Sequence, residues 1–274
     1  MKIIATFLSL VFFVSCVNSK EKSYTASTPA APIVRSFLGI PLTDSVDFIR
    51  WKLTLANNQY KLECNYGIGK SNTNGFYNGG EKIALTGVVK NEKNYYQLQN
   101  DNKTLSLVEL NADLLHLLDA DDNLLVGNGG WSYVLNNITP MITDQINITA
   151  RQTILKDSMA FEGRTPCGVP DIIASDMECY KLKWYVVFYA NAEKNESTTY
   201  RVFGTPYRKE GGKTGTWKII KGRDGRIIYQ LNDEKENAFI YLLKLGEGVL
   251  IFTDVKGNLL VGDLDFSYTL NRKF

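Results

Sequence analysis

The sequence predicts an all-β protein built from two small antiparallel barrels or sandwiches in tandem. Tyr and Phe number 15 and 13, and these side chains, like Val, Ile and Thr, suit a pleated strand surface. The length of 274 residues exceeds the commonest domain size of about 100 to 150 residues, so two domains are expected. One stretch also occurs twice: DNLLVGNGGWSYVLNN spans residues 122–137 and GNLLVGDLDFSYTLNR spans residues 257–272.

The first residues, MKIIATFLSLVFFVSC, predict an export signal over residues 1–15. One basic residue, Lys2, precedes an apolar run over residues 3–14 that is too short to cross a bilayer core of about 30 Å. Ser15 before Cys16 resembles the lipobox of bacterial lipoproteins, which implies cleavage before Cys16 and acylation of its thiol. The alternative is an ordinary signal peptide, cut somewhere before Lys20.

Residues 16–33 are rich in Ser, Thr, Ala, Lys and Pro, which predicts a flexible tether. No later run of 18 apolar residues exists, so we expect a membrane partner only through the N-terminal lipid anchor. Val17 is not the Asp that resembles an inner-membrane retention signal, so the outer membrane is preferred, facing either the periplasm or the cell surface. A net charge of +2 gives no reason to expect nucleic acid.

The repeat extends beyond the two endings, because further landmarks recur in the same order. They are Phe37-x-Gly39 with Phe161-x-Gly163, Trp51 with Trp184, Thr86-Gly87 with Thr214-Gly215, Tyr96-Gln97-Leu98 with Tyr229-Gln230-Leu231, and Asp119 with Asp254. We therefore expect one barrel over residues 34–137, a linker over residues 138–160 and a second barrel over residues 161–274.

Each copy contains short β-rich runs separated by turn residues. Examples are WKLTLANNQYKLEC, KWYVVFYA, TTYRVFGTPYR, TGTWKIIKG and RIIYQLN. LSLVELNADLLHLLD and FIYLLKLGEGVLIFTD each place two apolar runs around a short polar turn, which is typical of a hairpin. About seven short strands per copy, without a long helical period, favour a small antiparallel barrel or sandwich. Each repeated ending is expected to supply the strand that completes its copy.

The positions of the four cysteines predict different roles for them. With Cys16 assigned to lipid, Cys167 and Cys179 lie close together in an exported chain, which predicts a local disulfide. A metal-binding pair is the alternative, although the single histidine, His116, lies in the other copy. Cys64 is expected to be a small buried side chain, with a free reactive thiol as the alternative.

The second copy resembles a known family. Its FEGRTPC, KLKWYVVFY, GTWKII, IIYQLN and LLVGDLDFSYTL segments are similar to the N-terminal domain of NlpE, the copper-resistance and envelope-stress lipoprotein. The resemblance covers about residues 161–272, and the first copy is related only through the repeat. It implies lipocalin-like barrels. Cys167 and Cys179 stand in place of the family's Cys-x-x-Cys, and this departure favours a disulfide over metal handling.

Three further patterns suggest binding or catalytic sites but lack required residues. Gly67-Ile68-Gly69-Lys70-Ser71 resembles the end of a phosphate loop, but Cys64 occupies the first glycine position. The triplet Asp119, Asp121 and Asn123 begins like a calcium loop, but Leu124 and Gly130 replace the required Gly and Glu. His116 corresponds to Ile251 in the second copy, which disfavours a general base. We expect loops and turns at the first two places.

Two side-chain groups remain. Asp263 and Asp265 could act as an acid and base pair, and we interpret them as solvated loop carboxylates because the first copy has Asn128 and Gly130 there. An aromatic and basic set could bind a glycan or an anion, or could be core aromatics with charges at the rim. Its members are Trp184, Tyr189, Tyr200, Tyr207, Arg208 and Lys209.

The sequence therefore predicts a non-enzymatic, lipid-anchored envelope protein whose tandem lipocalin-like barrels bind a small ligand or an envelope partner. We expect no catalytic residue, no metal ligand and no cofactor. One alternative is an envelope-stress or copper-responsive sensor, as the family resemblance implies. Another is a hydrolase whose site has no recognisable motif.

Overall fold

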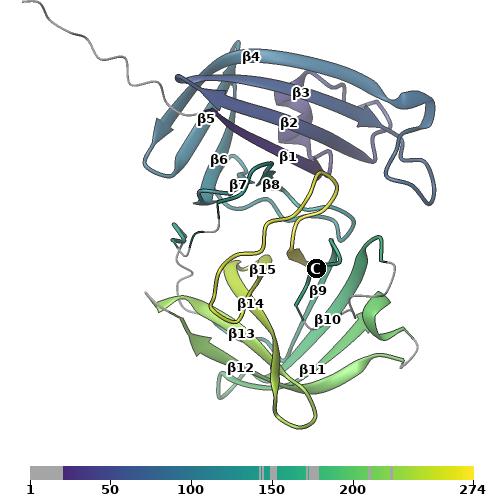
Figure 1. The fold of residues 1–274 in the computed structure, drawn as a ribbon, viewed down its shortest axis with the longest axis vertical. Helices are drawn as coiled ribbons and strands as arrows, with labels where there is room; N and C mark the ends of the chain where they lie inside the picture. The colour runs from purple at the N-terminus through teal and green to yellow at the C-terminus, as the bar shows by residue number, and fades with distance from the viewer. Residues whose placement is uncertain are drawn as a thin grey trace, which may run out of the picture.

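The chain forms two closed antiparallel barrels of eight strands each, in tandem, which confirms the predicted fold class (Figure 1). The computed structural model describes residues 21–141, 143, 145–148, 153–170, 172, 179–208, 211–222 and 225–274. The expected signal over residues 1–15 and Cys16 lie outside these residues. In the described part of the chain, no helix is long and apolar enough to cross a membrane.

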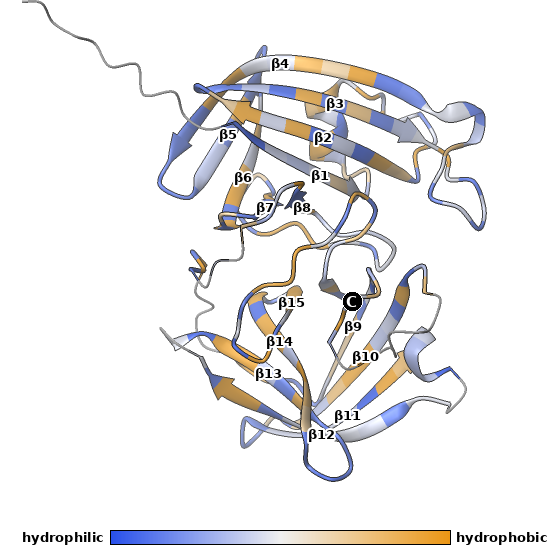
Figure 2. Ribbon diagram, in the orientation of Figure 1, coloured by the Kyte–Doolittle hydropathy of each residue, from blue (hydrophilic) through white to orange (hydrophobic). Residues whose placement is uncertain are grey.

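The first barrel has up-and-down connections, so each strand pairs with the next. Its strands are β1 (Lys22–Thr28), β2 (Phe48–Ala56), β3 (Gln59–Gly67), β4 (Glu81–Glu92), β5 (Tyr95–Asn100), β6 (Lys103–Asn111), β7 (Leu114–Leu117) and β8 (Val134–Asn137). Pairing of β1 with β8 closes it, with Tyr24 opposite Asn137. Alternate residues point inward, as the banding of apolar colour along the strands shows (Figure 2).

The second barrel repeats this order. Its strands are β9 (Ser158–Thr165), β10 (Leu182–Asn191), β11 (Glu196–Gly204), β12 (Lys213–Lys221), β13 (Ile227–Asn232), β14 (Ala238–Gly246), β15 (Val249–Thr253) and β16 (Thr269–Arg272). Strand β16 pairs with β9 to close the barrel, with Arg272 opposite Phe161. Each repeated ending therefore supplies the closing strand, as the sequence predicted.

The first barrel begins earlier than the sequence predicted. Residues Lys22–Thr28 form β1 rather than part of a tether over residues 16–33, so a domain boundary at residue 34 is wrong. Polar residues hid this strand, because Tyr24 and Ala26 are buried while Ser and Thr alternate with them. Only residues 17–21 separate Cys16 from β1. The second barrel likewise begins at Ser158, three residues before the expected boundary.

The predicted equivalence of Phe37 and Phe161 was also wrong. Phe37 lies in a short helix, α1 (Pro32–Leu38), and is not equivalent to Phe161 in β9. The strand register identifies Tyr24 as the equivalent residue. Tyr24 faces Leu53, two positions after Trp51, and Phe161 faces Val186, two positions after Trp184.

The repeated tryptophans make the same contact in each barrel. Trp51 Nε1 donates to Thr28 Oγ1 at 2.8 Å, and Trp184 Nε1 donates to Thr165 Oγ1 at 2.9 Å. In both cases the threonine ends the first strand of the barrel and the tryptophan lies on the second. The indole is thus buried with its one donor satisfied, which fixes the register of these strands.

The repeated Thr-Gly pairs leave room for a tyrosine. Tyr60 donates to the carbonyl oxygen of Gln99 at 3.0 Å, and Tyr200 donates to that of Asn232 at 2.9 Å. Both hydroxyls pass beside a glycine of the intervening strand, Gly87 or Gly215, where a Cβ would lie within about 3 Å of the tyrosine. The glycine is therefore required by close approach.

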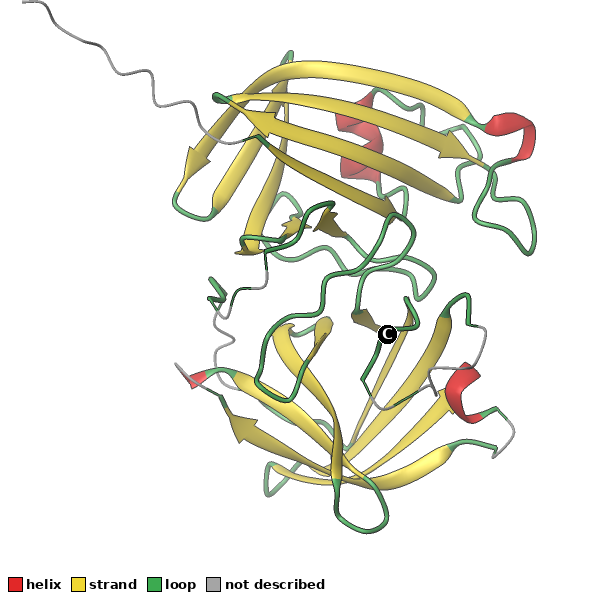
Figure 3. Cartoon of the chain, viewed as in Figure 1, coloured by secondary structure: helices red, strands yellow, loops and turns green. Residues whose placement is uncertain are grey.

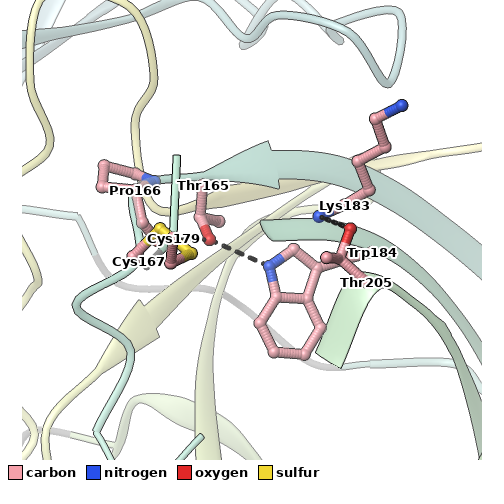
Figure 4. The surroundings of a disulfide bond; sticks show 7 residues. All are labelled: Thr165, Pro166, Cys167, Cys179, Lys183, Trp184 and Thr205. Carbon is pink, nitrogen blue, oxygen red and sulfur yellow. Dashed lines mark hydrogen bonds between the residues drawn. A yellow bond between two sulfur atoms is a disulfide. The ribbon is translucent and has the colours of Figure 1, made fainter. Parts of the chain in front are cut away.

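The connection after the first strand differs between the two barrels (Figure 3). In the first barrel it contains α1, which has Pro in its first turn, ends at Gly39 with a φ of 75°, and buries Val34 and Phe37 in the core. In the second barrel the connection is closed by the disulfide between Cys167 and Cys179, near Trp184 and Thr165 (Figure 4).

Glycine substitution tests the tyrosine contact. In Gly87→Ala or Gly215→Ala, the new Cβ would lie 2.4 Å from Gln99 O or 2.2 Å from Asn232 O. We expect each to lower the free energy of unfolding by about 2 kcal/mol or more, measured by urea denaturation. In the control Gly75→Ala, the nearest contact is 3.5 Å, so stability should be nearly unchanged. Equal stability of all three variants would contradict this explanation.

Candidate functional site

The two repeated endings meet each other at the junction of the barrels. Ser132 and Ser267, which are 135 residues apart and hold the same place in the repeat, lie with their Oγ atoms 2.5 Å apart. The loop from β15 to β16, yellow in Figure 1, crosses to the first barrel. The repeated sequence therefore builds both the closing strands and the contact between the barrels.

The contacts around this serine pair are reciprocal. The amide of Gly127 donates to Asn271 Oδ1 at 2.7 Å, and the equivalent amide of Gly262 donates to Asn136 Oδ1 at 2.9 Å. A Cβ at either glycine would lie about 2.2 Å or less from a carbonyl oxygen of its own loop. Equivalent residues thus exchange equivalent bonds, as they do across a twofold axis in a homodimer.

An apolar cluster that both barrels share surrounds these polar contacts. It is made by outward-facing residues of β6, β7, β14 and β15 and by the loops that follow. Equivalent members are Val108 with Leu243, Leu110 with Leu245, Leu114 with Val249, Leu124 with Leu259, and Val126 with Val261. On β7, Leu115 points into the barrel while Leu114 points into this cluster. Burial of this surface stabilises the docked pair.

His116 lies on the same outward face of β7 and is fully buried. Its Nδ1 donates to Leu117 O at 2.8 Å, and its Nε2 has no hydrogen-bond partner among the described residues. Burial lowers the pKa of the imidazole to about 4, so the ring is neutral near pH 7. The equivalent Ile251 lies in the shared cluster. His116 is thus a polar replacement within an apolar interface.

Asp263 is exposed in its loop, as the sequence predicted, whereas Asp265 is only partly exposed. Asp263 Oδ1 accepts the amides of Asp265 and Phe266, both at 2.8 Å, and so fixes the turn. Asp265 reaches the first barrel, where its carboxylate accepts from Arg50 Nη2 at 2.6 Å and from Asn74 Nδ2 at 2.7 Å. Asp265 therefore joins the two barrels.

The aspartates of the repeated turns also bind their own backbone. Asp119 Oδ1 accepts the amides of Asp121 and Asn123, both at 2.9 Å, and Asp254 Oδ1 accepts those of Lys256 and Asn258. The bond from the Asn123 amide is the main cause that lowers the pKa of Asp119. This geometry is the predicted turn. Among the described residues, no group of three or more His, Cys, Asp or Glu could hold a metal ion.

The three cysteines among the described residues, Cys64, Cys167 and Cys179, lie as the sequence predicted. Cys167 and Cys179 form a disulfide with a Cα separation of 5.9 Å, which confirms the pairing and removes their thiolates as metal ligands. Cys64 is free and buried, and burial raises the pKa of its thiol. A buried, protonated thiol is a poor nucleophile, so the structural interpretation of Cys64 is favoured.

The aromatic and basic set does not form one site. Trp184 and Tyr200 are core residues, Tyr207 is buried, and Tyr189 is on the surface. Lys209 lies outside the described residues. The glycine-rich segment after β3 is a loop, in which the Gly69 amide donates to Asp47 Oδ2 at 2.7 Å. That amide is therefore engaged within the protein rather than directed at a phosphate.

A groove at the junction was not visible in the sequence. Its volume is about 660 Å³, and both barrels line it. Its apolar lining residues are Val108, Leu118, Leu124, Val126, Ile148, Leu245 and Phe274. Asp119, Asp122 and Glu247 add carboxylates, and Tyr95 lies half-exposed beside them. The residues come from separate hairpins of two barrels, so no local motif could have revealed the groove.

Comparison with protein-family models, curated proteins and solved structures found no match. The resemblance to NlpE therefore stays a prediction that rests on the quoted residues.

Replacing His116 by its repeat equivalent tests the interface. The unfolded chain binds a proton at His116 near pH 6.5, while the folded chain keeps the ring neutral until about pH 4. Stability should therefore fall as the pH drops from about 6.5 to 4, by about 3 kcal/mol from this residue. In His116→Ile, urea unfolding should lack that part of the decline. An unchanged pH dependence would show that His116 is not buried in the docked protein.

Proposed function

We propose that this protein is a non-enzymatic, lipid-anchored component of the bacterial outer membrane that binds a small molecule or another envelope component at the junction of its two barrels. The observation that carries the proposal is the groove of about 660 Å³ that both barrels line. This volume lies in the range of known ligand sites, and the lining combines apolar residues with a comparable share of polar ones.

The interiors of the barrels support a site outside them. In the first barrel, Trp51 and Tyr60 are buried in the core, and in the second barrel Trp217 packs against Phe188 and Tyr229 with ring centroids 4.9 and 4.8 Å apart. Small barrels either enclose a ligand or fill with side chains. These side chains favour the second type, so the proposed ligand contacts the outer surface.

The fixed arrangement of the barrels supports the choice of the junction. The groove's walls belong to different barrels, so its shape depends on the reciprocal bonds of Asn136 and Asn271 and on the shared apolar cluster. A site held between docked domains is preorganised, which reduces the cost of binding. The carboxylates of Asp119 and Asp122 favour a ligand with a positive group beside an apolar one.

The connection between the proposed anchor and the first barrel is short. Five residues, 17–21, separate the proposed lipidated Cys16 from β1, and fully extended they span about 18 Å at most. The first barrel would therefore be held close to the membrane surface, with the β2–β3 turn after Ala56 near the anchor because Lys22 pairs with Leu55.

Photo-crosslinking in living cells tests the site and the anchor together. A benzophenone amino acid at Tyr95, which lines the groove and is 50% exposed, should give adducts detected by mass. The same amino acid at Tyr77, which is 51% exposed and lies outside the groove, is the matched control. We expect adducts at position 95 only. In Cys16→Ala, both these adducts and the labelling of the protein by fatty acid should be lost.

Equal adducts at both positions, or none at position 95, would contradict the proposed groove. Fatty-acid labelling that persists in Cys16→Ala would contradict the proposed anchor.

A further inference from the structure

A second hollow lies on the outer wall of the first barrel, away from the groove. Its volume is about 640 Å³, and outward-facing side chains of β1 to β4 form its floor. One side is closed by Leu264, which belongs to the loop of the second barrel that crosses here. The Ser27 hydroxyl donates to Leu264 O at 3.2 Å and holds that loop in place.

The strand register places polar groups of this floor in two neighbouring rows. One row runs Thr25, Lys52, Glu63 and Ala84 across the four strands. The next runs Ser27, Arg50, Asn65 and Lys82. Adjacent strands are about 4.8 Å apart, so the backbones of Lys52 on β2 and Lys82 on β4 are about 10 Å or more apart.

The charges in this hollow are unbalanced. Neither Lys52 nor Lys82 makes a hydrogen bond or salt bridge to another residue that the structure describes. The carboxylate of Glu63 is 2.7 Å from Lys61 Nζ, and that of Asp265 is 2.6 Å from Arg50 Nη2. Glu63 also interacts electrostatically with Lys52, which faces it across the strands, so the lining of the hollow holds three cations, Arg50, Lys52 and Lys82, for one carboxylate.

Two buried polar atoms of the floor also lack partners within the described structure. They are Nε of Arg50, a donor, and Oδ1 of Asn65, an acceptor, and these residues face each other on β2 and β3. Unsatisfied buried polar atoms are rare in folded proteins, and each is a candidate for a ligand contact. An anionic oxygen would satisfy the donor and a hydroxyl would satisfy the acceptor.

We propose that this hollow, formed by Lys52, Lys82, Arg50 and Leu264, binds the phosphate and hydroxyl head of an anionic amphiphile. Ammonium and guanidinium groups bind phosphate through charge-assisted hydrogen bonds. Leu264, which is 40% exposed, and the neighbouring Ala84 provide an apolar side for the start of an acyl chain. The site is complete only when the barrels are docked, and it does not depend on the groove.

Isothermal titration of the chain from Lys20 onward, which contains both complete barrels, tests this site. The probe is dihexanoyl phosphatidylglycerol below its micelle concentration, compared with dihexanoyl phosphatidylcholine and inorganic phosphate. We expect the phosphatidylglycerol to bind at least about tenfold more tightly than either of the others. Lys52→Gln with Lys82→Gln should weaken its binding about tenfold, because two charge-assisted bonds are lost.

Two further variants separate the charge from the apolar contact. Lys90→Gln with Lys103→Gln removes the same charge from exposed positions outside the hollow and should leave binding unchanged. Leu264→Ala should weaken phosphatidylglycerol binding about threefold without affecting inorganic phosphate. Equal affinity for phosphatidylglycerol and inorganic phosphate, equal effects of the two lysine pairs, or no binding would overturn the proposal.

Discussion

The exchange of bonds between Gly127 and Asn271, and between Gly262 and Asn136, is the contact on which the arrangement of this protein depends. Each bond joins the loop of one barrel to the closing strand of the other. Each glycine lies so close to backbone oxygen that no side chain fits. The two serines meet between these bonds, and the apolar cluster encloses them. Because the interface is self-complementary, the same repeated sequence supplies the contact residues on both of its sides.

The two barrels differ where the pattern is broken. His116 holds the position in the first copy that Ile251 holds in the second. Asp265, which binds Arg50, holds the position in the second copy that Gly130 holds in the first. The connection after the first strand also differs, because it contains a helix in the first copy and a disulfide in the second. Arg50, which Asp265 binds, lines the second hollow together with Lys52, Lys82 and Leu264. The second hollow therefore lies beside one of these departures, whereas the groove is lined by residues that recur in both copies, such as Asp119, Leu124 and Val126.

The fold could be predicted because strand periodicity and the repeat are local signals. Trp51 and Trp184, and the glycines of the Thr-Gly pairs, recur at matching places in the sequence, and they make equivalent contacts in the two barrels. Strand β1 was missed because Ser and Thr hid the alternation of Tyr24 and Ala26. The role of Asp265 and both hollows were missed for another reason. They depend on how the barrels dock, and residues such as Arg50 and Asp265 are 215 positions apart.

Formation of a disulfide across the junction tests the reciprocal interface most directly. In a variant with Ser132→Cys and Ser267→Cys, the new sulfurs would occupy the positions of two hydroxyls that lie 2.5 Å apart. Mild oxidation should link them within one chain, and peptide mapping by mass spectrometry should recover the linked pair in a monomer. Ser132→Cys alone should stay unlinked. Two free thiols after oxidation, or links only between separate chains, would contradict the docked arrangement.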